Sequence, residues 1–172
     1  MKKSICLLTI TLCIFFTSCQ EKNTIPENSE LIKVIENETK TFYEKDFKKW
    51  SSNFVNNENV YWICVEPEFL LRANGWKDLS KFVGDWMKEN PKPIDYKKAN
   101  FKILDLKITT NNNMAYVSFK YSNENKDVAV NKSIESRVLV QENQKWKIIS
   151  MVSYPDDNSR NSTQNIYYYN CK

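Results

Sequence analysis

The order of the periodic segments is the feature that most constrains this fold. Two helical patterns and a short β-rich run come first, a third helical pattern follows, and long alternating runs fill residues 101–154. Helices and strands that are segregated along a chain are typical of α+β folds, in which helices cover one face of an antiparallel sheet. The sequence therefore predicts an α+β fold with helices packed on one face of a curved sheet.

Three segments have helical periodicity. The first occupies residues 30–45, where one face carries four apolar positions: Leu31, Ile35, Phe42 and Tyr43. Ser29 is expected to cap this helix and Asp46 to cap a second, short one, because both side chains can accept a hydrogen bond from a free backbone N–H. A third helix is predicted over residues 77–89, before two prolines that end it.

The strand predictions rest on β-rich composition and on alternation. A first run covers residues 60–65, and a short return strand follows before Gly75. Four longer strands are expected at 101–109, 114–121, 134–141 and 146–154. Alternation in the first of these places four side chains on one face: Phe101, Ile103, Asp105 and Lys107. Asparagine-rich and polar turns separate the strands, so the segment is predicted to form an antiparallel meander.

The amino-terminal segment has the layout of a secretory signal. Lys2 and Lys3 precede an apolar stretch over residues 5–16, and small residues lead to Cys19. A cysteine at this place resembles the lipobox of bacterial lipoproteins, which implies lipid attachment to its thiol. An ordinary secretory signal and a membrane anchor are the alternatives, but the apolar run is shorter than the roughly 20 residues that span a bilayer.

These observations divide the chain into four parts. Residues 1–18 are predicted to be a lipoprotein signal peptide, 19–29 a polar tether, 30–155 the folded domain, and 156–172 a tail. The protein is therefore expected in the cell envelope, attached to a bacterial membrane through lipid on Cys19.

Composition excludes several classes of function. The formal net charge is +4 and the basic residues are interspersed with acids, so the clustered basic surface of a nucleic-acid-binding protein is not expected. The chain has no histidine, which excludes imidazole bases and the commonest metal ligand; we expect no metal site and no cofactor. Cys64 and Cys171 form either a disulfide or two separate thiols.

Three short stretches resemble the nuclear transport factor 2-like superfamily, which includes ketosteroid isomerases and polyketide cyclases. Asp46 is followed by Asn-Asn-Glu-Asn-Val at residues 56–60, Gly75 precedes the third helix, and Gln-Lys-Trp-Lys-Ile at 144–148 resembles the family's last hairpin. The resemblance covers about residues 30–155. It implies a cone-shaped, curved antiparallel sheet with about three helices packed on its concave face.

The resemblance also implies what this chain lacks. An ungapped alignment through Asp46 places Glu38 where ketosteroid isomerases have an oxyanion-binding tyrosine. It places Trp62 where they have the aspartate that moves the proton, and Ser136, beside Glu135, near the oxyanion-binding aspartate. Steroid isomerase activity is therefore expected to be absent, with Trp62 acting through packing.

The candidate pocket consists of five residues: Glu38, Trp62, Cys64, Trp86 and Ser136. Four charged residues are candidates for a polar centre: Glu38, Arg72, Glu135 and Arg137. The competing interpretation, which we adopt here, is that Glu38 and Glu135 are solvated charges and that the aromatic residues are core.

The leading functional hypothesis is non-catalytic binding of an apolar small molecule, or scaffolding at a membrane. One alternative is a small isomerase, dehydratase or cyclase with a non-standard carboxylate base. Another is a protein-interaction module, including a homodimer, that uses the outer face of the sheet. A buried carboxylate with a raised pKa would favour the enzyme, and an aromatic cavity would favour binding.

Overall fold

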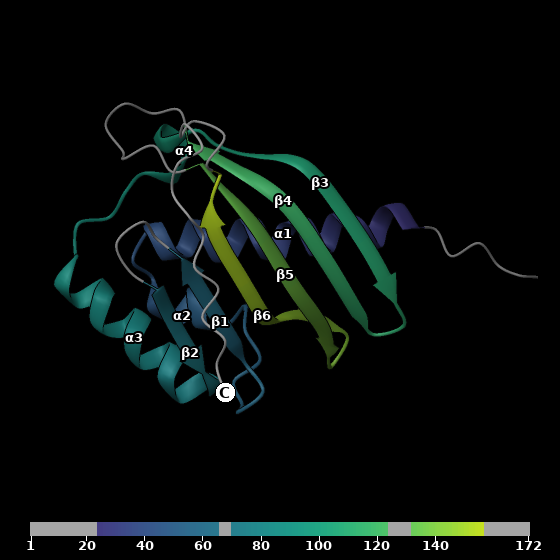
Figure 1. The fold of residues 1–172 in the computed structure, drawn as a ribbon, viewed down its shortest axis with the longest axis horizontal. Coiled ribbons are helices and arrows are strands. Elements are labelled where there is room, and N and C mark those ends of the chain that lie inside the picture. Colours follow the sequence, from purple (N-terminus) through teal and green to yellow (C-terminus); the bar gives the residue numbers. More distant parts are fainter. Residues whose placement is uncertain (1–23, 66–69, 124–131, 157–172) are drawn as a thin grey trace, which may run out of the picture.

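The computed structural model describes residues 24–65, 70–123 and 132–156, and Figure 1 shows their arrangement. The signal peptide, Cys19, Cys171 and the tail beyond Asp156 lie outside the described residues. Lipid attachment and the disulfide therefore stay predictions. Among the described helices, none is long and apolar enough to cross a membrane.

Six strands form one curved, unclosed sheet (Figure 1). They are β1 (Tyr61–Val65), β2 (Leu70–Asn74), β3 (Phe101–Asn111), β4 (Met114–Asn123), β5 (Lys132–Glu142) and β6 (Lys145–Pro155). Their order across the sheet is β2-β1-β6-β5-β4-β3. The predicted α+β class and curved sheet are confirmed.

One strand pair departs from the predicted antiparallel sheet. β1 and β6 run parallel, whereas all other neighbours are antiparallel. A parallel neighbour needs a long connection, and here residues 66–144 lie between the two strands in sequence. The β1–β2 hairpin is thereby joined to the edge of the later meander.

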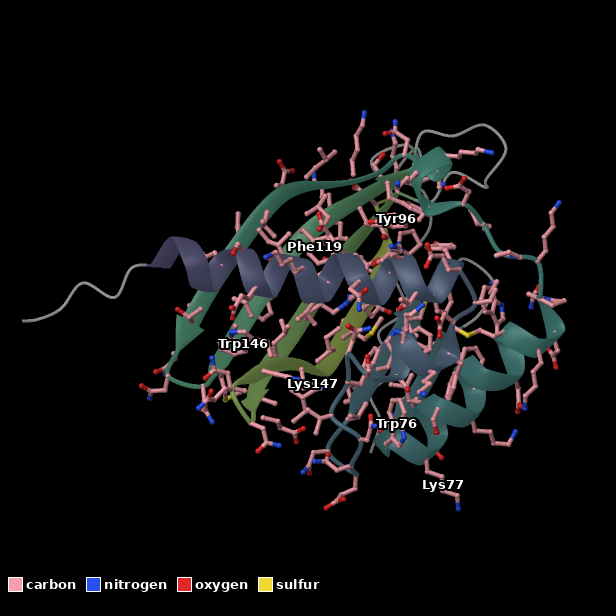
Figure 2. The ribbon with its side chains drawn as sticks, turned by 180° about the vertical axis from the view of Figure 1, so that it is seen from behind. Trp76, Lys77, Tyr96, Phe119, Trp146 and Lys147 are labelled. Atoms are coloured by element: carbon pink, nitrogen blue, oxygen red, sulfur yellow. The ribbon has the colours of Figure 1, made fainter. Side chains whose placement is uncertain are left out.

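Four helices accompany the sheet: α1 (Thr24–Tyr43), α2 (Phe47–Ser51), α3 (Gly75–Glu89) and α4 (Tyr96–Ala99). Figure 2 shows α1 crossing the inner face of the sheet, while α3 packs against β1 and β2. α4 is a single turn that was not expected from the sequence. Asp95 caps it by accepting hydrogen bonds from the backbone N–H groups of Lys97 and Lys98.

The predicted start of α1 is wrong. The helix begins at Thr24, so Ser29 lies inside it, and residues 24–29 of the predicted tether are helical. Pro26 does not prevent this extension, because the first turn of a helix has N–H groups without intrahelical partners in any case. The predicted cap of α2 is confirmed, since Asp46 Oδ1 accepts a hydrogen bond from Lys49 N–H at 3.0 Å.

Gly75 determines where α3 begins. Its φ of +81° lies in a region that side chains with a Cβ rarely adopt, and its N–H donates to the Val60 carbonyl at 2.7 Å. A Cβ there would lie 3.4 Å from the Cα of Glu58. A glycine is therefore required where β2 turns into the helix.

The inner face of the sheet forms the core with α1. On β4 the side chains of Ala115, Val117, Phe119 and Tyr121 are buried, and the intervening ones are more exposed. The alternation predicted for β3 fails beyond Ile103. Between Leu104 and Lys107 the register with β4 shifts, and Asp105 has a φ of +53°. This bulge interrupts the alternation, so Asp105 and Lys107 are exposed while Phe101 and Ile103 are half-buried.

Candidate functional site

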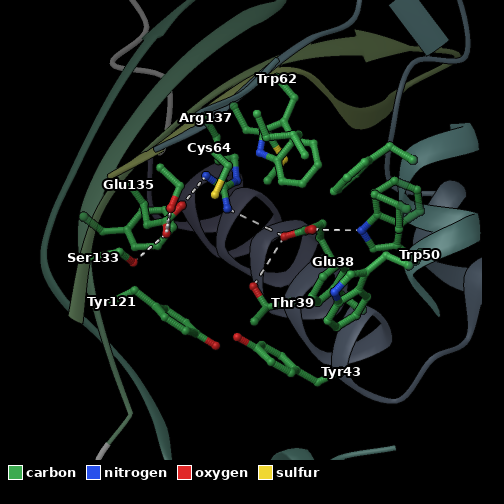
Figure 3. Close-up of a pocket in the computed structure, with 18 residues that line it drawn as sticks. Glu38, Thr39, Tyr43, Trp50, Trp62, Cys64, Tyr121, Ser133, Glu135 and Arg137 are labelled. Carbon is green, nitrogen blue, oxygen red and sulfur yellow. Dashed lines mark hydrogen bonds and ion pairs between the residues drawn. The ribbon is translucent and has the colours of Figure 1, made fainter. Parts of the chain in front are cut away.

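A cavity lies inside the cone, between α1, α3 and the inner face of the sheet (Figure 3). Its volume is about 330 Å³. Aromatic rings make much of the wall: Phe42 and Trp86 stack with their ring centroids 4.7 Å apart, and Trp62 and Phe82 lie 5.7 Å apart. The cavity is therefore mainly apolar.

One buried polar cluster interrupts the apolar wall. Arg137 on β5 lies between two carboxylates, Glu135 on the same strand and Glu38 on α1 (Figure 3). All three residues are buried: Arg137 and Glu38 are each 4% exposed, and Glu135 is 7% exposed. Arg137 and Glu135 are two positions apart on one strand, so both side chains point toward the helix that crosses this face.

Glu135 is fully engaged by its neighbours. Its Oε2 accepts a hydrogen bond from Arg137 Nη1 at 2.7 Å, and its Oε1 accepts hydrogen bonds from the hydroxyls of Ser133 at 2.6 Å and Ser153 at 2.7 Å. Bonds to an ionised carboxylate are among the stronger hydrogen bonds in proteins. Glu135 therefore anchors Arg137 to β5 and joins β5 to β6.

Glu38 is held less tightly. Trp50 Nε1–H donates to Oε1 at 2.9 Å, the Thr39 hydroxyl lies 3.4 Å from Oε2, and Arg137 Nη2 lies 3.8 Å from Oε2. Burial raises the pKa of the Glu38 carboxyl, and Glu135 adds to the rise, although Arg137 and Trp50 act in the opposite direction. Glu38 is therefore the carboxyl of the cluster whose surroundings shift it toward its protonated form.

Arg137 stays charged in this setting. Burial opposes its charge, but the two carboxylates outweigh that effect and raise the pKa of the guanidinium. Nη1 also donates to the Ser136 carbonyl at 3.1 Å, whereas Nε has no hydrogen-bond partner among the described residues.

Two tyrosines complete the polar side of the cavity. Tyr121 on β4 and Tyr43 at the end of α1 point their hydroxyls toward one another in Figure 3. Burial raises the pKa of the Tyr121 hydroxyl, and Tyr43 adds to the shift. Tyr121 therefore keeps its proton and can donate it in a hydrogen bond.

The structure places the predicted site residues as follows. Glu38, Trp62, Cys64 and Trp86 all line the cavity. Ser136 does not, because alternation along β5 points it to the opposite face from its neighbours Glu135 and Arg137. The pocket assignment of Ser136 is therefore corrected.

The interpretation of Glu38 and Glu135 as solvated charges is wrong, since both are buried around Arg137. Arg72 does not join this cluster. It is exposed on β2, where Nε donates to Asn74 Oδ1 at 3.4 Å and the guanidinium lies over the Tyr61 ring.

Several site residues were not singled out from the sequence: Thr39, Tyr43, Tyr121, Ser133 and Ser153. A signal existed for Glu38, because it lies three residues after Ile35 and four before Phe42, on the apolar face of α1. Ser133 shares the inner face of β5 with Glu135, two positions away, whereas Ser153 meets Glu135 only because β5 and β6 pair. Within residues 24–65, 70–123 and 132–156, no group of ligand side chains could hold a metal ion.

No protein-family model matches the chain, and no curated protein matches it. Solved structures do. A nuclear transport factor 2-like protein of unknown function from Pseudomonas putida has a TM-score of 0.60 at 11% identity, and the match covers 75% of this chain and 86% of that one. The chain has the nuclear transport factor 2-like fold.

Two further matches have the same fold. A nuclear transport factor 2-like protein of unknown function from Silicibacter pomeroyi has a TM-score of 0.57 at 11% identity, covering 77% of this chain and 98% of that one. A proposed ketosteroid isomerase from Parabacteroides distasonis has a TM-score of 0.55 at 16% identity, covering 74% and 88%. At such identities the similarity shows the fold alone.

Proposed function

We propose that this protein binds a small, largely apolar organic molecule inside the cone. The observation that carries the proposal is the cavity of about 330 Å³, whose wall is aromatic and aliphatic apart from one buried polar cluster and the hydroxyls of Tyr43 and Tyr121. Small-molecule sites in proteins are typically concave and apolar, with a few polar groups that orient the ligand. Burial of the ligand's apolar surface supplies affinity, at about 25 cal/mol per Å².

The polar contacts favour binding over catalysis. A base needs a carboxylate oxygen within hydrogen-bond reach of the proton that it removes. Both oxygens of Glu135 already accept hydrogen bonds, and Glu38 Oε1 is occupied by Trp50. The carboxylates are thus used to fix Arg137 and α1 against the sheet.

A neutral apolar fluorophore, N-phenyl-1-naphthylamine, tests the proposal. We expect its fluorescence to rise on binding and the melting temperature of the protein to increase with its concentration. Cys64→Trp places bulk in the cavity and should abolish binding. Ile63→Trp is the matched control, because its neighbouring position on β1 does not line the cavity. Equal binding by both variants, or none by the unmodified protein, would contradict the proposal.

One observation favours a second function, acid–base catalysis by Glu38. Glu38 lines the cavity and burial raises the pKa of its carboxyl, and a carboxyl with a perturbed pKa in a cavity is a candidate for acid–base catalysis. Deuterium exchange into the methyl group of 2-acetylnaphthalene in D2O, followed by NMR, measures proton removal directly. Catalysed exchange that is lost in Glu38→Gln but kept in the control Glu36→Gln, on the exposed side of α1, would support the enzyme.

We also propose that the domain works at a bacterial membrane, to which lipid on Cys19 attaches it. The support is the signal-like layout of residues 1–19. Mass spectrometry of protein purified from membranes should find a lipid-modified amino terminus at Cys19, and Cys19→Ala should leave an unlipidated precursor. A free amino terminus elsewhere would refute the anchor and leave the binding proposal intact.

A further inference from the structure

The outer face of the sheet carries large apolar side chains that contact solvent. Along each strand the outward residues alternate with those that face the core, and the pairing register aligns them in rows across the sheet. The described helices α1 and α3 lie on the inner side, so neither covers this face (Figures 1 and 2). Five apolar side chains on it are between 43% and 65% exposed: Leu70, Leu104, Met114, Tyr116 and Tyr154. Apolar surface of this kind, gathered on one face, is typical of interaction sites.

The charged side chains at the centre of this face are cations. Arg72, Lys120 and Lys147 lie between inward-facing neighbours on β2, β4 and β6, so they point outward. Lys107 on β3 pairs with Ser118, which lies between two buried residues of β4, and it therefore shares the same face. Four bases thus stand among the exposed apolar residues, and the register places no acid in their rows.

Two acids at the margin of the face compensate one of these bases. Lys120 Nζ lies 3.2 Å from Asp105 Oδ2, on the bulge of β3, and 3.9 Å from Asp156 Oδ2, at the end of the described chain. Arg72 and Lys107 form no ion pair with a carboxylate of the described residues. The centre of the face therefore has surplus positive charge beside apolar surface.

A second copy of the chain fits this face poorly. In a two-fold dimer the same patch from both copies meets, so bases would be buried against bases without acids between them. Like charges that are brought together at an interface disfavour the complex. A bilayer of acidic lipids offers what the face lacks, because negative headgroups attract the bases and the acyl boundary accepts the apolar side chains.

We propose that the outer sheet face docks on the surface of a bilayer that contains acidic phospholipids. The exposed apolar side chains enter the headgroup region, the tyrosine hydroxyls stay hydrated, and Arg72 and Lys107 approach lipid phosphates. The proposed anchor would bring the domain to such a surface, because only residues 20–23 separate Cys19 from α1 and they span at most about 14 Å. The inference goes beyond binding inside the cone and does not depend on it.

Sedimentation with lipid vesicles tests this docking in the absence of the anchor. The protein used is residues 20–172, which contain every described helix and strand and the core. We expect it to bind vesicles of phosphatidylglycerol mixed with phosphatidylcholine, and to bind them less tightly as salt is added. Binding to phosphatidylcholine alone should be at least about tenfold weaker, because that surface lacks net negative charge.

Matched charge variants assign the affinity to the face. Arg72→Gln combined with Lys107→Gln should weaken binding to the mixed vesicles about twentyfold, because each base near an acidic bilayer contributes about fivefold. Lys33→Gln combined with Lys77→Gln is the control, since it removes the same charge from exposed positions on α1 and α3. This control should bind as the unmodified protein does. Thermal unfolding checks that each variant is folded.

Two further variants test the apolar contacts and the tail. Met114→Ser combined with Tyr116→Ser should weaken binding to the mixed vesicles about tenfold or more, because membrane affinity scales with buried apolar area. A chain that ends at Asp156 should keep its affinity, since the tail is not part of the proposed surface.

The results that would overturn the proposal differ from those expected above. They are equal binding to both kinds of vesicle, an equal loss in the two charge variants, or loss of binding when the tail is removed. A stable dimer in sedimentation equilibrium that the Met114 and Tyr116 variant dissociates, without vesicle binding, would assign the face to a second copy. Each of these results leaves the proposed binding of a small molecule inside the cone standing.

Discussion

Replacement of Arg137 by methionine removes the one cation of the buried cluster while keeping a long, flexible side chain. In the structure the guanidinium lies 2.7 Å from Glu135 and 3.8 Å from Glu38. Removal of one partner from a buried ion pair costs about 3–5 kcal/mol, because the remaining charge is left without compensation. We expect a loss of that size at pH 7.5, a large part of the roughly 5–15 kcal/mol that stabilises a domain.

The loss of stability in Arg137→Met should depend on pH. The titration of Glu38 determines whether this loss grows or shrinks as pH rises. Burial already raises the pKa of its carboxyl, and Arg137 is the main influence that lowers it. Without Arg137 the folded state holds the proton to higher pH, whereas the unfolded chain releases it near pH 4.5. The stability of the variant therefore falls as pH rises above that value, by up to about 1.4 kcal/mol per unit for each proton. The deficit should be largest at pH 7.5 and smaller near pH 4.5.

Urea unfolding followed by tryptophan fluorescence at pH 4.5 and 7.5 measures both effects. Arg72→Met is the control, because Arg72 is exposed on β2, and surface substitutions usually change stability by less than about 0.5 kcal/mol. A loss below about 1 kcal/mol in Arg137→Met at pH 7.5, or the same loss at both pH values, would refute the assignment of a charged, buried cluster.

Three further substitutions test the burial of Glu38, the turn at Gly75 and the helix cap at Asp46. Glu38→Gln removes the carboxyl whose pKa is raised, so stability plotted against pH above about 4.5 should fall less steeply than in the unmodified protein; an unchanged slope would contradict the burial of that charge. Gly75→Ala should destabilise by about 1–2 kcal/mol, because alanine is strained at a φ of +81°, and a neutral result in thermal unfolding would argue against that turn. Asp46→Ala should cost about 1 kcal/mol through loss of the cap on Lys49 N–H, whereas Asp46→Asn should retain most of the stability.

The fold could be predicted because its signals are local. Alternation over β4, β5 and β6, and the cap at Asp46, are properties of a few neighbouring residues, and they predicted the order of the elements. The parallel pairing of β1 with β6 and the bulge near Asp105 depend on contacts between distant segments, which alternation does not encode. The start of α1 was misplaced because its first turn is polar.

The site was harder to predict, because residue type alone does not determine whether a charged side chain is solvated or buried. Glu38 was assigned to solvent from its residue type, although its spacing from Ile35 and Phe42 placed it on the apolar face. The structure explains this burial: Trp50 donates a hydrogen bond to the Glu38 carboxyl and Arg137 places a positive charge beside it. Such compensation is required for buried charges, so an acidic residue on an apolar face predicts a partner elsewhere in the chain.

The two candidate functions require different behaviour of the proton on the Glu38 carboxyl: a binder keeps it there, and an enzyme transfers it. Glu135 and Arg137 form a balanced ion pair whose hydrogen bonds hold it to β5 and β6. Glu38 is the remaining acid, and with its proton bound the cluster carries no net charge, which suits a neutral ligand. If Glu38 instead loses its proton once a ligand is bound, the same carboxyl becomes a base enclosed in an apolar cavity, where its basicity is enhanced. A bound ligand that excludes water raises the Glu38 pKa in either case, so deuterium exchange into 2-acetylnaphthalene decides between them: exchange that Glu38→Gln abolishes favours proton transfer, and binding without exchange favours a binder.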